Sequence, residues 1–148
     1  CGGVAPAPGE RTVEDDALLD AAGALLETVR GFVEEQAFHR ALEAIWRVVG
    51  DANRYVDAQA PWALRKTDPA RMATVLHTLA ETIRRLAILI QPFTPDAAAT
   101  LLDQLAQPTD LRDFTALTPS NALRPGTALP KPQGVFPRYV DADEGEGA

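Results

Sequence analysis

Apolar side chains recur at alternating steps of three and four residues along most of residues 13–106, and this spacing constrains the fold more than any other feature. The clearest stripe starts at Phe38 and ends at Val56. Such steps place side chains on one face of an α-helix, whereas a half-buried strand would show strict alternation. Aromatic residues make up only 6% of the chain, and Ala and Leu dominate, which also favours helices over sheets.

Three long stripes are expected to form the core. The first consists of Leu18, Ala22, Leu25, Val29 and Phe32. The second consists of Phe38, Leu42, Ile45, Val49, Ala52 and Val56. The third consists of Met72, Leu76, Leu79, Ile83, Leu86 and Ile90. Helices carrying these stripes would bury them against one another.

Prolines and short polar residues predict where the helices begin and end. Pro61 cannot donate an amide hydrogen and moves Ala60 away from the α region, so the second helix should stop there. Asp68-Pro69 and Thr94-Pro95 each pair an N-cap residue with a proline in the first turn. We therefore predict helices over 13–35, 37–60, 69–90 and 95–106, with a connector over 61–68 that has room for one helical turn.

The resulting architecture is an all-α, antiparallel bundle of about four helices with an extended C-terminal segment. Residues 1–12 are rich in Pro and Gly and should form a flexible loop. The bundle would span 13–108, and residues 109–140 would pack on it in extended form, with Val135, Phe136 and Tyr139 pinned to a groove. The acidic residues 141–148 should be disordered.

Charge is unevenly distributed along a chain whose net charge is -7. Residues 38–91 carry eight bases and five acids, a local charge of +3, whereas residues 10–36 carry eight acids and two bases. The overall acidity argues against a dedicated nucleic-acid binder, but a local basic patch can still attract phosphates. Mixed charge on solvated helix faces explains the same pattern equally well.

The sequence shows no catalytic or metal-binding constellation. His39 and His77 are isolated, and Cys1 is the only cysteine. Asp51 and Asp57 are six residues apart on a helix, so they would lie on different faces rather than act as an acid/base pair. No apolar run is long enough to cross a bilayer, and the start lacks Met and a signal-peptide pattern. We expect the chain to be part of a longer protein.

Trp62 is the residue whose role decides the function. It follows Pro61 directly, at the point where the chain must change direction. A flat aromatic ring there can complete a helix–helix core, or it can serve as a platform for another flat ring. The residues alone leave both roles open, and the core role is the more frequent one for a Trp in a helical bundle.

The segment Ala52-Asn53-Arg54-Tyr55-Val56-Asp57-Ala58-Gln59-Ala60-Pro61-Trp62 resembles the signature of the α-helical anticodon-binding domain of methionyl-tRNA synthetases of bacterial type. The segments 79–95 and 129–138 resemble the next helix and the closing segment of that family. The resemblance covers about residues 14–140 and implies that the chain reads the anticodon loop of tRNA(Met). In that family the matching tryptophan stacks on the first anticodon base, which gives Trp62 this role and makes Pro61 the residue that shapes the corner.

The resemblance also suggests supporting residues. Asn53 could hydrogen-bond a base edge, and Asp57 could repel misplaced phosphates, although a hydrogen bond between helices would explain both residues as well. Arg54, Arg65 and Lys66 could contact phosphates, which would position the loop without specifying its sequence. The family also uses an asparagine and an arginine on a helix that would precede Cys1, so we expect weak anticodon binding by this chain and an exposed apolar groove.

The parent enzyme implied by the resemblance is a cytoplasmic ligase of protein biosynthesis that attaches methionine to tRNA. Its ATP and Mg²⁺ would be used by a catalytic domain outside this chain, so we expect the chain to be inactive alone and to need no cofactor. The expected partners are tRNA(Met) and that catalytic domain, with no membrane. Two alternatives remain: the bundle of another class I synthetase, or a protein-interaction bundle with Trp62 in its core.

Overall fold

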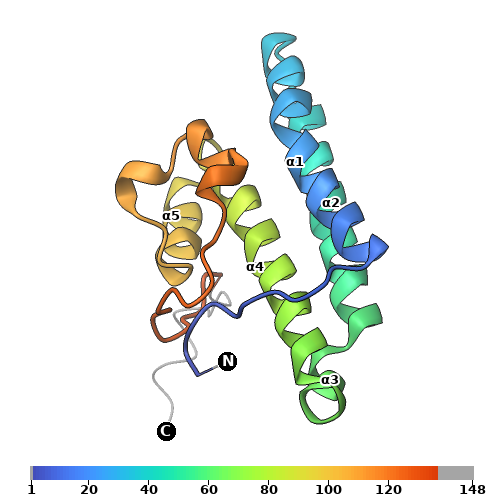
Figure 1. Cartoon of the computed structure of the whole chain (residues 1–148). Coiled ribbons are helices and arrows are strands. Elements are labelled where there is room, and N and C mark those ends of the chain that lie inside the picture. The colour runs from blue at the N-terminus through green and yellow to red at the C-terminus, as the bar shows by residue number, and fades with distance from the viewer. Residues whose placement is uncertain (1, 137–148) are drawn as a thin grey trace, which may run out of the picture.

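A computed structural model describes residues 2–136, and within this range the chain folds into five α-helices. The long helices α1 (Val13–Glu34), α2 (Phe38–Gln59) and α4 (Pro69–Ile90) are joined by short connections. The short helix α3 (Pro61–Thr67) lies between α2 and α4, and α5 (Pro95–Gln104) follows α4. Figure 1 shows α1 and α2 as an antiparallel pair beside α4, with α3 at one end of the bundle. The predicted all-α class is confirmed.

Helix α4 is the centre of the arrangement because it contacts each of the other four α-helices. It also contacts the short 3₁₀ helix η2 (Phe114–Leu117). The main core joins α1, α2 and α4 through buried residues such as Leu25, Ile45 and Leu89. A second, smaller core joins α4, α5 and η2 through Ala87, Ile88, Leu102 and Ala116. No helix among residues 2–136 is both long and apolar enough to cross a membrane.

The connector after α2 is more helical than predicted, since α3 occupies Pro61–Thr67 rather than a single turn. Pro61 at the first helical position is preorganised for a helix, which explains why the chain resumes helical geometry so soon. Helix α5 ends two residues earlier than predicted, at Gln104, because Leu105 caps it and Ala106 adopts a left-handed conformation with φ of 52°.

The segments on either side of the bundle also differ from the expectation of loose or extended chain. Ala5 is buried, its amide donates to the Thr127 carbonyl at 2.8 Å, and Val4 forms an antiparallel bridge with Ala128. Residues 109–121 form three 3₁₀ helices, η1 (Thr109–Leu111), η2 and η3 (Pro119–Asn121). Turn-forming residues at their starts, such as Asp113, whose side chain accepts from the Thr115 amide, favour these turns over extended chain. The expectation for residues 141–148, and for Tyr139, lies outside the described residues.

The predicted core stripes of α2 and α4 are partly wrong. The buried side chains of α2 are Ala41, Ile45, Val48 and Tyr55, whereas Phe38 is 53% exposed. Four residues of the predicted stripes line an apolar groove of about 430 Å³: Val49, Val56, Leu79 and Ile83. Val49 and Leu79 are partly buried and also pack against the main core, as predicted. The buried face of α2 is therefore shifted toward Ala41, Val48 and Tyr55, and the buried face of α4 includes polar residues such as Thr74, Thr78 and Thr82.

Candidate nucleic-acid interface

A sharp corner between α2 and α3 presents Trp62 to solvent. Ala60 ends α2 in the left-handed region, with φ of 42° and ψ of 59°, and also precedes the first residue of α3. Pro61 is buried beneath this corner. A left-handed conformation costs an alanine roughly 1–2 kcal/mol, so packing of the surrounding residues must hold it. The surrounding structure thus holds the corner in a backbone conformation that alanine would not adopt by itself.

The side chain of Trp62 is 64% exposed. This exposure rules out the core role and leaves a flat indole surface open to a ligand. Arg65 and Lys66 follow three and four residues later, in the last turn of α3, and both are exposed. Residues at these spacings share one helix face, so the indole and the two cations lie together. An aromatic face beside positive charge is the combination that single-stranded nucleic acids require.

Asn53 and Asp57 lie one turn apart on α2, and both are exposed. Neither side chain forms a hydrogen bond or ion pair with another residue among residues 2–136. The alternative role for them, a hydrogen bond between helices, therefore does not apply within that range. Asn53 also lines the apolar groove beside Trp46, a second exposed tryptophan.

Arg54 is exposed and forms an ion pair with Asp51 in the same helix. Its side chain is 73% exposed, and surface pairs of this kind contribute at most about 1 kcal/mol. The pair is weak enough that a phosphate could replace Asp51 as the partner of Arg54. The structure thus keeps Arg54 available, but on α2 rather than on α3 with Arg65 and Lys66.

A buried polar cluster lies behind the corner and was not predicted. The Asp15 carboxylate on α1 accepts hydrogen bonds from the Tyr55 hydroxyl and from the Arg71 guanidinium, whose Nη2 lies 2.8 Å from Oδ1. It also accepts from the Thr12 amide at 2.8 Å, in the capping box that starts α1. Burial alone would raise the pKa of Asp15, but the bonds from Arg71, Tyr55 and Thr12 outweigh it and lower the pKa to about 2.

The same cluster also shifts the pKa values of Tyr55 and Arg71. Burial, followed by the hydrogen bond to Asp15, raises the pKa of Tyr55. The hydrogen bond to Asp15 raises the pKa of Arg71. Near neutral pH the cluster therefore holds a charged carboxylate, a charged guanidinium and a neutral phenol. One feature of the sequence could have indicated this cluster. Arg71 lies in the first turn of its helix, where a positive charge is unfavourable to the helix dipole and needs an acidic partner from another element.

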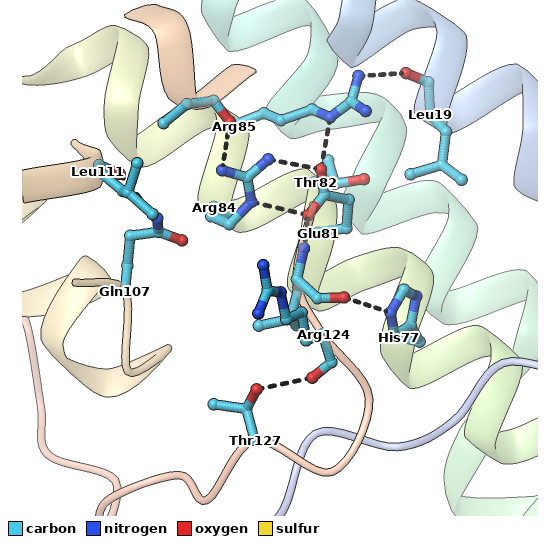
Figure 2. A network of polar contacts seen from close by, with 12 residues as sticks. Leu19, His77, Glu81, Thr82, Arg84, Arg85, Gln107, Leu111, Arg124 and Thr127 are labelled. Atoms are coloured by element: carbon cyan, nitrogen blue, oxygen red, sulfur yellow. Dashed lines mark hydrogen bonds and ion pairs between the residues drawn. The ribbon is translucent and has the colours of Figure 1, made fainter. Parts of the chain in front are cut away.

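A second buried cluster fastens the C-terminal segment to α4. Glu81 accepts from Arg84 Nε at 2.7 Å, from Arg85 Nε at 2.8 Å and from the Leu123 amide at 2.9 Å. Arg84 donates further to the Ala116 carbonyl at 2.9 Å. Figure 2 shows Glu81, Arg84 and Arg85 together, with His77 bonded to the chain near Arg124. His77 is isolated from other potential catalytic or metal-binding residues in the sequence, but its Nε2 lies 3.1 Å from the Leu123 carbonyl oxygen, so it belongs to this attachment.

Burial alone would raise the pKa of Glu81, but its bonds to Arg84, Arg85 and the Leu123 amide lower it overall. Glu81 is therefore a charged structural anchor and not a proton donor. Among residues 2–136, no group of three or more His, Cys, Asp and Glu side chains is arranged to hold a metal ion. The two buried clusters stabilise the fold, whereas the exposed residues at the corner are available for recognition.

These features, together with the similarity to known proteins, define the class of protein as an α-helical anticodon-binding domain. The chain belongs to the family of the anticodon binding domain of methionyl tRNA ligase, whose sequence profile matches residues 5–147. It is 58% identical to the methionine–tRNA ligase of Mesorhizobium japonicum over 141 residues, which is 95% of this chain and 27% of that protein. It is 52% identical to the Mycobacterium leprae ligase over 151 residues, 99% of this chain and 28% of that protein.

A solved structure supports the same assignment. The chain superimposes on the free form of Mycobacterium tuberculosis methionyl-tRNA synthetase with a TM-score of 0.89 and 50% identity. The match covers 93% of this chain and 28% of that one. The resemblance inferred from the sequence is therefore confirmed at the level of family and fold. This chain spans little more than a quarter of the length of the relatives it matches.

Proposed function

We propose that this domain binds the anticodon loop of tRNA(Met), with the indole of Trp62 stacked on an unpaired base. The observation that carries the proposal is the exposed ring at a corner fixed by Ala60 and the buried Pro61. Unpaired loop bases can be splayed out and stacked on aromatic side chains, and each stack contributes about 1–3 kcal/mol.

The polar and charged residues around the corner would make the other contacts to the RNA. Asn53 would hydrogen-bond the edge of a base, and Asp57 would disfavour loops whose phosphates approach it. Arg65 and Lys66 on α3, and Arg54 on α2, would contact phosphates and so set the register of the loop. All five side chains are exposed, as these roles require.

The larger activity would belong to the ligase of which such a domain is part. We infer that this ligase uses ATP and Mg²⁺ to attach methionine to tRNA in the cytoplasm, in a catalytic domain that acts as the partner of this one. The domain itself would contribute binding and need no cofactor. Support comes from relatives named as methionine–tRNA ligases, of which the chain matches 27–28% of the length.

Neither alternative is favoured. A bundle from another class I synthetase would not be expected to show 50–58% identity to methionine enzymes. A protein-interaction bundle that uses Trp62 in its core requires a shielded indole, and this one is exposed. The family that the chain resembles reads the CAU anticodon of tRNA(Met). A panel of anticodon stem-loops therefore provides the direct comparison, because only the loop with the CAU anticodon should bind preferentially.

The experiment is titration of a labelled CAU anticodon stem-loop with the chain and with two matched variants, at low salt and at protein concentrations that saturate the weak binding expected of this chain. Trp62→Ala removes the proposed platform, and Trp46→Ala removes a tryptophan of nearly equal exposure, 60% against 64%. We expect Trp62→Ala to weaken binding by about 5- to 150-fold, the equivalent of one base stack. Trp46→Ala should change it by less than about twofold. Equal effects of the two substitutions, or no effect of Trp62→Ala, would refute the proposal.

A further inference from the structure

Arg71 contacts the chain on both sides of the corner that carries Trp62. Its Nη2 donates to Gln59 Oε1 at 2.7 Å, just before the corner. Its backbone amide donates to Asp68 Oδ1 at 2.9 Å, just after α3, in the N-cap bond of α4, which does not depend on the side chain at position 71. Ala60 and all of α3 lie between these two contacts. The Arg71 side chain therefore holds the chain before the corner, and the N-cap bond of α4 holds the chain after it.

The other contacts of Arg71 connect this segment to the rest of the bundle. Its guanidinium bonds both carboxylate oxygens of Asp15, which is fully buried on α1. Asp15 in turn accepts from Tyr55, one turn before Gln59 on α2. Arg71 thus joins α1, the C-terminal turn of α2 and the start of α4 at one point.

The corner needs such support. Ala60 holds a left-handed conformation that alanine avoids, and α3 is only a seven-residue helix. A helix this short is not stable on its own and depends on contacts with its surroundings. Recognition by stacking also requires the ring to be held within narrow limits of position and angle.

We propose that Arg71 is a positioning residue for anticodon recognition: by bonding Asp15 on α1 to Gln59 at the end of α2, its guanidinium fixes the orientation in which α3 presents Trp62. This inference rests on the proposed function for its consequence in RNA binding, but its structural part can be measured without RNA. Arg71 itself does not contact the RNA in this account. Its side chain is only 16% exposed, and its guanidinium is occupied by partners within the chain.

The first test follows amide hydrogen exchange in α3 by NMR. The amides of Ala63 and Leu64 both donate to the Ala60 carbonyl, so their protection reports on the corner directly. Arg71→Met should lower their protection by about tenfold or more relative to amides of α5. Arg85→Met is the matched control, because Arg85 has the same residue type, a similar exposure of 15% and a buried carboxylate partner, Glu81, elsewhere on α4. It should leave the relative protection of α3 unchanged.

Two further variants keep the test decisive. Gln59→Ala removes the hydrogen bond from Arg71 to Gln59 and leaves the Asp15–Arg71 pair intact. It should therefore lower the hydrogen-exchange protection of α3 even if Arg71→Met fails to fold. Arg71→Lys keeps the charge but cannot bond Asp15 and Gln59 together through a planar fork. Lys should therefore fail to restore protection or RNA binding. Full rescue by Lys would show that charge alone matters, and would overturn the positioning role.

The second test measures binding of the CAU stem-loop. Arg71→Met should weaken it by about tenfold, within the effect of removing one stack, and should cause no further loss in a Trp62→Ala background. Additive losses would mean that Arg71 acts independently of Trp62, which overturns the inference. If Trp62→Ala alone has no effect, the proposed function fails, whereas unchanged α3 exchange in both Arg71→Met and Gln59→Ala defeats the positioning role regardless of RNA.

Discussion

Replacing Glu81 with Gln tests the energetic role of the buried cluster on α4. Arg84 is fully buried, and Glu81 accepts two of its hydrogen bonds, at 2.7 and 2.8 Å, as well as one from Arg85 at 2.8 Å. A neutral amide at position 81 would leave the Arg84 charge without its counterion. Breaking a buried pair in this way costs about 3–5 kcal/mol. Total stabilities of small domains are only about 5–15 kcal/mol, so the effect should be large.

The structure also predicts an asymmetry between the two partners. Arg84→Met leaves Glu81 paired with Arg85 and with the Leu123 amide, so no buried charge is stranded. Its main cost is the unpaired Ala116 carbonyl, which we place at about 1–3 kcal/mol. The free energy of unfolding from urea titration at pH 7 measures both variants. A cost below about 1 kcal/mol for Glu81→Gln, or a larger cost for Arg84→Met, would contradict the described electrostatics.

Three more predictions follow from the corner and its support. Because the pKa of Asp15 is lowered to about 2, its contribution of roughly 2 kcal/mol should be complete above about pH 5 and be lost as the pH falls toward 2; Asp15→Asn should abolish that part of the pH dependence of the urea midpoint. Removing Arg65 and Lys66 together should weaken binding of all stem-loops alike and reduce the salt dependence, by about 0.7 in log–log slope for each phosphate that these cations no longer neutralise. Ala60→Gly should relieve the strain of the left-handed conformation and raise the free energy of unfolding by up to about 1 kcal/mol, which a thermal melt would show as a slightly higher midpoint temperature. A lower midpoint would show that Ala60 is not strained.

The ends of the helices were the most predictable part of the fold. Pro69 and Pro95 start α4 and α5 where the sequence places them, because a proline at the first helical position needs no amide partner. Pro61 stopped α2 as expected. The same local chemistry located the exposed Trp62, although its exposure itself depends on packing that no local pattern describes.

The buried faces and polar clusters could not be predicted in the same way. Periodicity identifies an apolar stripe but does not say whether another helix covers it, so residues such as Ile83 were assigned to the core although they line a groove. Glu81 and Arg85, four residues apart, look like an ordinary surface pair. Asp15 and Arg71 are 56 residues apart, and only the three-dimensional arrangement brings them together.

The most direct measurement of the central claim is the fluorescence of Trp62 itself. In a Trp46→Phe background, Trp62 is the only tryptophan, because the chain has two. Stacking of a base on its exposed indole should quench the emission in proportion to the bound CAU stem-loop, with the same dissociation constant as an independent binding assay. Binding of the stem-loop without any change in Trp62 emission would contradict the account.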